Sequence, residues 1–272
     1  MGSSEDSGLT PSMEQVILGV VLAFAIALTS YVARFLTFSG AVAACFLAAV
    51  IFGVGGWKWT IPIFIFFFLS SLLSKVGQAR KARFASVLEK SSTRNHGQVL
   101  ANGGVAGFLA LWQVAFPLAD FYPMYLGAVA AVTSDTWATE IGLLTRGKTF
   151  SIVSFRTVDQ GMSGGISWLG LSAGLLGAGV IAGSAIFWAK GMKALAFVAA
   201  AGFVASLIDS FLGGTIQGEY ECTVCGRSTE RAEHCGMPAK LVKGYPAFNN
   251  DSVNWLCAFA GAILIWLFQL MS

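Results

Sequence analysis

The chain has 272 residues, of which 56% are hydrophobic and 11% charged, and its mean hydropathy is +0.71. Soluble domains carry about 25% charged residues, and one soluble core could not bury this much apolar surface, so the composition excludes a water-soluble globular protein. A net charge of +3 is too small to indicate nucleic-acid binding. The chain is predicted to be a polytopic membrane protein that contacts the lipid bilayer and no nucleic acid.

The first 15 residues are polar and include Glu5, Asp6 and Glu14 but no Lys or Arg. They therefore lack the basic start of a secretory signal peptide. We expect residues 1–15 to form a disordered lead-in and residues 16–272 to form a single integral membrane domain, with residues 218–251 inserted as a polar loop.

Eight apolar segments come close to the length of about 20 residues that crosses a bilayer. They lie at about 16–36, 38–56, 60–74, 98–116, 122–142, 164–188, 194–217 and 252–271. The predicted fold class is all-α, a bundle of about eight transmembrane helices. Gly179 and Gly183 have the four-residue spacing that permits close packing of such helices.

The distribution of basic residues orients the bundle, because loops rich in Lys and Arg stay in the cytoplasm. With the N-terminus outside, every basic residue except Lys58, Lys190 and Lys193 falls on the inner side, out of 17 in the chain. The long polar loops at about 75–97, 143–163 and 218–251 then all face the cytoplasm. Any chemistry is expected there.

Three acidic residues, Asp135, Glu140 and Asp209, fall within apolar segments. A carboxylate inside a bilayer costs roughly 2.5–3.5 kcal/mol even on insertion scales, so it normally faces a cavity, a cation or a partner. These residues are the main candidates for function. Pairing with a buried Arg, capping of a neighbouring helix, and a proton or sodium relay are the alternatives.

Asp135 and Asp209 occur in similar surroundings, each followed by a hydroxyl residue, Thr136 or Ser210. Both lie roughly 10–12 Å from the cytoplasmic end of their segments, so they could share one site. Two carboxylates at one depth suit Mg²⁺ with substrate phosphates. Glu140 falls on the helical face of Thr136, not of Asp135, which favours a supporting role or pairing with a loop Arg.

Two glycine pairs, Gly103-Gly104 and Gly164-Gly165, stand where predicted segments re-enter from the cytoplasmic side. Free N–H groups at a helix start attract phosphate, and glycine allows close approach. Each pair follows a polar residue, Asn102 or Ser163, so the two hairpins are interpreted as a weak internal repeat. Close helix packing is the alternative explanation of the glycines.

Further phosphate-binding candidates lie in the loops and at helix starts. Arg94 and Asn95 precede the first glycine pair, and Arg could bind a phosphate with two hydrogen bonds. Lys148 and Arg156 lie in the loop that joins the two hairpins. Asn254 lies in an Asn-rich helix start, where capping is the alternative role.

The third loop contains Cys222, Cys225, His234 and Cys235. Four soft ligands at this spacing, each pair followed by Gly, are typical of a small structural zinc site. Unmetallated thiols are the alternative. A closed four-ligand site would leave no open position for catalysis.

Several sequence motifs occur in a combination that is specific enough to indicate a protein family. They are Arg94-Asn95, Gln98, Asn102-Gly103-Gly104, the run from Ser134 to Gly142, Gly164-Gly165, Asp209-Ser210 and Asn254. In this combination the chain resembles the domain-of-unknown-function ninety-two family of integral membrane proteins, which includes human transmembrane protein nineteen and the plant phytyl-phosphate kinase of tocopherol synthesis. More distantly, it is similar to phytol kinase, dolichol kinase and phosphatidate cytidylyltransferase.

The resemblance implies a site for a nucleotide, CTP or a related triphosphate, and Mg²⁺ at Asp135 and Asp209. We therefore expect a kinase that converts a prenyl monophosphate of phytyl or geranylgeranyl type to the diphosphate at the cytoplasmic face. The tail would lie among the spans, beside the Phe-rich segment 60–74. The expected location is the inner membrane of a bacterium, since the transit peptide of the plant enzyme is not found.

Two other classes of function remain open. A secondary transporter would use Asp135 and Asp209 as intramembrane binding groups of a repeat, although such groups are expected near the midplane. A membrane scaffold would recruit a partner through the Cys/His loop.

Overall fold

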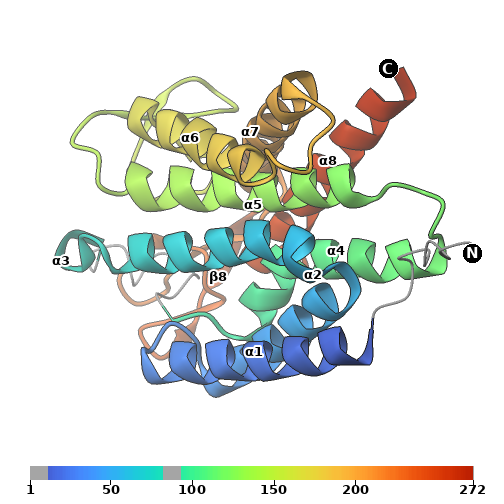
Figure 1. Cartoon of the computed structure of the whole chain (residues 1–272). Helices are drawn as coiled ribbons and strands as arrows, with labels where there is room; N and C mark the ends of the chain where they lie inside the picture. Colours follow the sequence, from blue (N-terminus) through green and yellow to red (C-terminus); the bar gives the residue numbers. More distant parts are fainter. Residues whose placement is uncertain (1–11, 82–92, 272) are drawn as a thin grey trace, which may run out of the picture.

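The computed structural model describes residues 12–81 and 93–271. The described residues are mostly helical (Figure 1). The helices are α1 (Met13–Val32), α2 (Phe38–Lys75), α3 (Gln78–Lys81), α4 (His96–Ala115), α5 (Tyr122–Gly142), α6 (Trp168–Ser184), α7 (Met192–Thr215) and α8 (Asn250–Met271). The prediction of a disordered lead-in falls mainly on residues 1–11, which lie outside the described residues. Ser12 caps α1 by accepting a hydrogen bond from the Gln15 N–H at 3.1 Å, so the helix begins three residues before the predicted segment.

Helix α2 unites the second and third predicted segments in one run of 38 residues. Gly56 interrupts it with φ +56° and ψ −149°, a conformation that glycine adopts without a Cβ penalty. The helix consequently bends into two arms that run in different directions (Figure 1). The Gln15 side-chain amide donates to the carbonyls of Phe52 and Gly53 just before the bend, at 3.1 and 3.0 Å.

Helix α5 lies at the centre of the bundle and contacts α2, α4, α6, α7 and α8. Its buried residues include Tyr125, whose hydroxyl donates to the Trp59 carbonyl of α2. Small residues bring the neighbouring helices close: a Cβ on Gly261 of α8 would lie 2.4 Å from the Gly127 carbonyl oxygen. Gly174 and Gly177 of α6 likewise pack on Ser134 and Trp137. Close backbone approach between small residues is how helices associate in a bilayer.

Gly179 and Gly183 do not mediate helix packing, so that part of the prediction is wrong. A Cβ at either position would meet no described atom within 4 Å. The packed face of α6 is instead formed by Gly170, Gly174 and Gly177, at spacings of four and three residues. The four-residue motif fits either face of a glycine-rich helix, and only the position of α5 decides between them.

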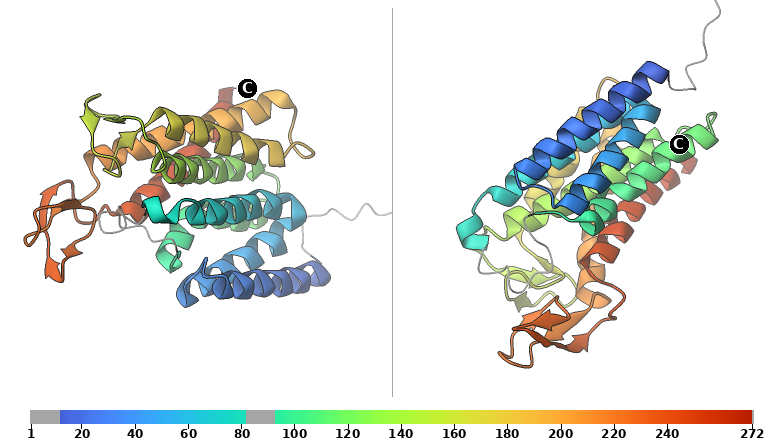
Figure 2. Two further views of the ribbon diagram at one scale, coloured as in Figure 1. Left: turned by 90° about the vertical axis from the view of Figure 1, so that its left-hand side faces the viewer. Right: turned by 90° about the horizontal axis from the view of Figure 1, so that it is seen from below.

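The all-α prediction needs one correction, because the second and third polar loops contain short antiparallel strands. In the second loop β1 (Thr149–Ser151) pairs with β2 (Thr157–Val158) and β3 (Gly165–Ile166). In the third, β4 (Glu219–Glu221) pairs with β5 (Ser228–Thr229) and β8 (Lys240–Lys243), and β6 (Glu233–His234) pairs with β7 (Met237–Pro238). Figure 2 shows both loops at one end of the bundle.

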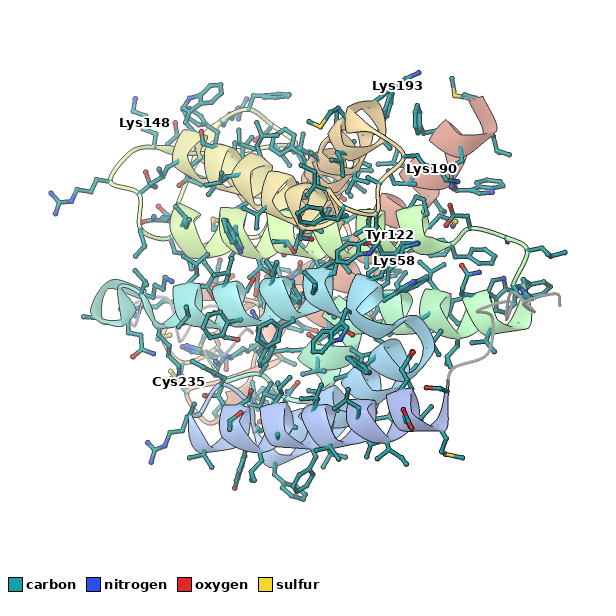
Figure 3. All side chains as sticks on the ribbon, viewed as in Figure 1. Lys58, Tyr122, Lys148, Lys190, Lys193 and Cys235 are labelled. Carbon is teal, nitrogen blue, oxygen red and sulfur yellow. The ribbon has the colours of Figure 1, made fainter. Side chains whose placement is uncertain are left out.

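The three basic residues that the sequence sets apart from the others share one end of the bundle in the described part of the chain. Lys58, Lys190 and Lys193 lie at one end, while Lys148 and Cys235 mark the other (Figure 3). At the first end Lys190 pairs with Asp120 at 2.9 Å, and the Lys58 ammonium lies 4.2 Å from the centre of the Tyr122 ring. The long loops therefore share one end, called the polar-loop end below.

Four of the described helices, α1, α2, α7 and α8, are long and apolar enough to cross a membrane. Helix α6 is apolar but shorter, with 17 residues. Helices α4 and α5 have 20 and 21 residues and carry polar side chains along their length. The described chain is thus a multi-pass helical membrane protein, and the count of eight crossings stays a prediction.

Candidate functional site

Asp135 and Asp209 line one cavity at the polar-loop end of the bundle. Asp135 lies on α5 and is 5% exposed, and Asp209 lies on α7. The two helices are tied together beside the acids by a hydrogen bond of 2.8 Å between the hydroxyls of Ser134, which precedes Asp135, and Ser206, three residues before Asp209. The cavity has a volume of about 110 Å³, and Ser210 also lines it. The structure thus brings the two predicted carboxylates to one site, here called the acidic cavity.

The second glycine pair lines the same cavity but does not begin a helix. Helix α6 begins at Trp168, after its N-cap Ser167, so the prediction of a helix start at Gly164 is wrong. Gly164 has φ +75°, and a Cβ there would lie 2.5 Å from the Gly214 Cα of α7. The pair is therefore needed for a tight loop against α7, with Gly165 in strand β3.

The Cys/His loop contributes a third carboxylate to the acidic cavity. Glu230 directly follows β5, lines the cavity and accepts a hydrogen bond from the Ser163 hydroxyl at 2.5 Å. Asn250, the first residue of α8, also lines it. Sequence reasoning missed Glu230 because it lies 21 residues beyond Asp209 in a loop rich in charge. The three carboxylates line the cavity from separate elements, but in the described part of the chain they are not among the groups of three or more side chains close enough together to hold a metal ion.

Thr136 and Glu140 lie on the opposite side of α5 from Asp135. They line a smaller cavity of about 40 Å³, together with Ser74, Arg94, Gln98, Asn102, Thr139 and Asn254. Successive helix residues point about 100° apart, which separates Asp135 from Thr136. Thr139 lines both cavities and therefore stands between them. We call the second space the amide cavity, after its Gln and Asn side chains.

Glu140 is occupied by two partners within the amide cavity. One carboxylate oxygen pairs with the Lys81 ammonium at 2.6 Å, and the other accepts from the Ser74 hydroxyl, also at 2.6 Å. The side chains of Lys81 and Glu140 are 12% and 21% exposed. The predicted pairing with a loop cation is thus present, although the cation is a Lys, and Glu140 does not line the acidic cavity with Asp135 and Asp209.

Arg94 lies before α4 with its guanidinium 5.4 Å from the centre of the Phe66 ring. Its backbone is fixed between α1 and α2: its N–H donates to the Phe35 carbonyl, and its carbonyl accepts from the Thr37 N–H, both at 3.0 Å. Burial lowers the pKa of the Arg94 guanidinium, and the Glu140 carboxylate opposes that shift. An anion bound beside Arg94, in addition to Glu140, would therefore stabilise the charged guanidinium.

The first glycine pair lies inside α4, not at its start. Asn95 is the N-cap of α4, in a reciprocal arrangement with Gln98, so its predicted phosphate-binding role is replaced by capping. Gly103 packs against Leu47, and Gly104 packs against Trp255. Close helix packing, the alternative explanation, accounts for this pair. Asn102, one turn after Gln98, donates to the Gln98 carbonyl at 2.7 Å.

Asn254 reaches the amide cavity, whereas Asn249 performs the capping. The Asn249 side chain accepts a hydrogen bond from the Ser252 N–H at 2.9 Å. Asn254 is 2% exposed and lies in the second turn of α8. Its side-chain oxygen, like that of Asn102, is buried without a hydrogen-bond partner among the described residues.

Lys148 and Arg156 are exposed in the second loop and line neither cavity. Lys148 precedes β1, and Arg156 lies in the turn between β1 and β2. Topology alone suggested their proximity to the acids. The hairpin instead directs both side chains to solvent, and Thr149 and Gln160 of the same loop face the acidic cavity.

Cys222, Cys225, His234 and Cys235 form a compact cluster that could hold a metal ion. Their ligand atoms all lie within 4.8 Å of one another. The backbone N–H groups of Val224 and Cys225 each approach the Cys222 sulfur at 3.4 Å, and the Cys225 N–H is the largest cause that lowers the pKa of the Cys222 thiol to about 6. A thiolate is the form that binds a metal, so the cluster fits zinc in ligand type, number and spacing.

The fold and these cavities define the class of protein: a multi-pass helical membrane protein with polar and acidic cavities at its polar-loop end. The chain belongs to the integral membrane protein family DUF92, whose model matches residues 21–262.

Relatives of the chain come from plants, archaea and cyanobacteria. It is 29% identical over 269 residues to Protein PGR of Arabidopsis thaliana, covering 89% of this chain and 92% of the relative. It is 28% identical to an uncharacterized membrane protein of Methanocaldococcus jannaschii (85% and 92% covered) and 26% identical to one of Synechocystis (64% and 69%). No solved structure matches the chain.

Proposed function

We propose that the protein is a Mg²⁺-dependent kinase that transfers the terminal phosphoryl group of CTP, or of a related nucleotide, to a prenyl monophosphate. The observation that carries the proposal is the shared cavity of Asp135 and Asp209, with Glu230 at the same site. Carboxylates gathered at the polar-loop end of a membrane bundle suit a soluble nucleotide better than a carrier site at the midplane.

The proposed reaction needs little covalent help from the protein. An oxygen of the acceptor phosphate attacks the terminal phosphorus of the nucleotide, the bond to the bridging oxygen breaks, and the nucleoside diphosphate leaves. Such transfers depend mainly on positioning and on neutralised charge. Asp135 and Asp209 would hold Mg²⁺, which when bound neutralises charge on the phosphates. The acceptor phosphate needs no strong general base.

Orientation and metal content complete the proposal. We place the polar-loop end in the cytoplasm and the N-terminus outside, with eight crossings of a bacterial inner membrane, because every basic residue except Lys58, Lys190 and Lys193 falls on one side in the predicted topology. We also assign zinc to the Cys/His cluster, since three thiols and one imidazole match a closed structural site.

The test is phosphoryl transfer with purified protein in lipid nanodiscs. Labelled CTP, UTP and ATP are each offered with phytyl or geranylgeranyl monophosphate, with and without Mg²⁺. We expect a labelled prenyl diphosphate with at least one donor and none without Mg²⁺. Absence of product with every pair of donor and acceptor contradicts the kinase; proton- or sodium-coupled uptake into vesicles would then favour the transporter.

A further inference from the structure

A third cavity lies between α1, the two arms of α2 and α4, and it is apolar. Its volume is about 90 Å³, several times the roughly 10–15 Å³ that one water requires. Small side chains from α1 and α2 open it, including Ala27, Ala44 and Ala48, and Phe64, Phe66 and Phe67 form one wall. A space of this size can hold a short stretch of one hydrocarbon chain.

The apolar cavity meets the amide cavity at its polar end. Arg94, Gln98 and Asn102 line both spaces, so an apolar chamber continues into a polar one. Arg94 is the one charged residue among the described residues that line the apolar cavity. A ligand that fills both spaces must be apolar along its length and polar at one end.

The positively charged Arg94 in the amide cavity favours binding of an anion. Lys81 pairs with Glu140 at 2.6 Å, and the Glu140 carboxylate also acts on Arg94, so the two cations and one anion together leave a single positive charge. Within the described part of the chain, the Arg94 guanidinium makes no ion pair and no side-chain hydrogen bond. An uncompensated charge away from water is costly, and a phosphate can accept two parallel hydrogen bonds from a guanidinium.

Unpartnered amide groups at the same place indicate a polar ligand independently. The side-chain oxygens of Asn102 and Asn254 are buried without a partner among the described residues. Asn254 is 2% exposed, so bulk water does not reach it freely. A side-chain amide accepts through its oxygen and, turned by 180°, donates through its nitrogen, so these groups suit the P–OH and P–O⁻ groups of a phosphate monoester.

We propose that the apolar and amide cavities together bind a lipid monophosphate with a single hydrocarbon chain. The phosphate contacts Arg94, Asn102 and Asn254, and the chain extends past Ala27 and Phe66. The inference rests on the proposed function, because this lipid is its acceptor. The acceptor then lies on the α4 side of α5, across that helix from the acidic cavity. Thr139, which lines both the acidic and the amide cavity, lies where the two substrates meet.

The structure also explains how the position of Arg94 is maintained. A Cβ on Gly40 would lie 2.3 Å from the Arg94 carbonyl oxygen, so only glycine at this position lets α2 pass the loop so closely. The loop then reaches the mouth of the apolar cavity through its contacts with Phe35 and Thr37. Arg94 is therefore fixed by its backbone, and its side chain is left to the ligand.

The test measures binding, separately from catalysis. Protein in nanodiscs of neutral lipid is titrated with geranylgeranyl monophosphate. Three comparison probes are titrated in the same way: geranylgeraniol lacks the phosphate, inorganic phosphate lacks the hydrocarbon chain, and phosphatidic acid carries two chains. We expect binding of the monophosphate to exceed that of each other probe at least tenfold. Equal binding of inorganic phosphate or phosphatidic acid, or no binding of the monophosphate, overturns the proposal.

Three variants locate the site, and a fourth is the control. Arg94→Gln should weaken monophosphate binding by about 10- to 100-fold and leave binding of the alcohol unchanged. Ala27→Leu and Ala44→Leu should weaken both by filling the cavity, whereas Ala25→Leu, on the exposed face of α1, should change neither. If Ala27→Leu does not fold, Ala44→Leu decides. Unchanged binding in Arg94→Gln and Ala44→Leu overturns the proposal.

The binding assay and the transfer assay test the lipid site and the kinase separately. Arg94-dependent binding without transfer from any nucleotide refutes the kinase and keeps the lipid site. Transfer that proceeds with unchanged lipid affinity in Arg94→Gln and Ala44→Leu keeps the kinase and refutes this location of the acceptor.

Discussion

The two sides of α5 differ in charge, although they lie within one helix diameter. On the α6 and α7 side, Asp135, Asp209 and Glu230 surround the acidic cavity. On the α2 and α4 side, Arg94 and amide side chains surround a space that continues into an apolar chamber. We propose that a cation and a nucleotide bind on the first side and an anionic lipid on the second. A helix can separate two binding chemistries by about 100° of rotation between neighbouring residues.

The largest expected effect is on the acidic side. Asp135→Asn or Asp209→Asn should lower the rate of phosphoryl transfer by about 10²–10³-fold, because charge stabilisation at the reacting phosphates is lost. Lipid binding on the other side should not change. Asp120→Asn is the matched control, since that carboxylate lies at the opposite end, paired with Lys190. Full activity in both acidic-cavity variants would contradict the proposed function.

The Cys/His loop should affect only the acidic side. Cys222→Ser is expected to abolish zinc binding, from one zinc per chain to none in metal analysis, because the four-ligand site loses a thiolate. Since Glu230 follows β5 in the same loop, transfer should fall about tenfold or more, while affinity for the lipid monophosphate stays the same. Cys45→Ser in α2 is the control. Zinc retained at one per chain in Cys222→Ser would refute the metal assignment.

The ion pair on the other side should contribute a smaller stability effect. Lys81→Gln and Glu140→Gln should each lower the free energy of unfolding by about 1–3 kcal/mol, because each leaves a partly buried charge without its partner. The double variant should cost less than the sum, and thermal unfolding in detergent measures the coupling. Additive losses would show that the pair does not act as a unit. Lys81→Gln should also lower affinity for the anionic lipid, because the Glu140 carboxylate that lines the amide cavity then keeps its negative charge without a partner.

The smallest effect concerns the packing of α6 on the acidic side. A Cβ at Gly174 would lie 3.0 Å from the Ser134 hydroxyl, beside the bond that ties α5 to α7. Gly174→Ala should therefore destabilise the protein by about 1 kcal/mol, whereas Gly179→Ala, with no neighbour within 4 Å, should not. Melting temperatures of the two variants give the comparison. Equal destabilisation would mean that α6 does not pack on α5 by this face.

Much of the fold follows from residue patterns that act locally. Apolar length predicts the helices, and the ends of the segments agree within a few residues, as for α5 and α8. Helix α2 differs from its prediction because its bend occurs within an apolar run. Gly56 adopts non-helical dihedral angles there, and no polar residues mark the interruption in the sequence. The short strands of the loops were not predicted, because two or three residues give no recognisable alternation of side chains.

The candidate site was only partly predictable for a similar reason. Burying acids is costly, so Asp135 and Asp209 could be found from their positions inside apolar segments, and the cysteine spacing indicated the metal cluster. The glycine pairs were misinterpreted as helix starts, because glycine serves turns, close packing and phosphate binding alike. Glu230 and Gln160 carry no local signal, since polar residues in a polar loop are ordinary.

The sequence by itself determined a multi-pass helical membrane protein, its family, and the separation of basic residues between its two ends. These depend on hydrophobicity, spacing and charge, which are properties of single residues and short segments. Only the tertiary structure decided that the predicted site residues lie on two sides of α5, and that an apolar chamber adjoins Arg94. A cavity is formed by residues distant in sequence, and its lining depends on how helices rotate and pack, which no local pattern fixes.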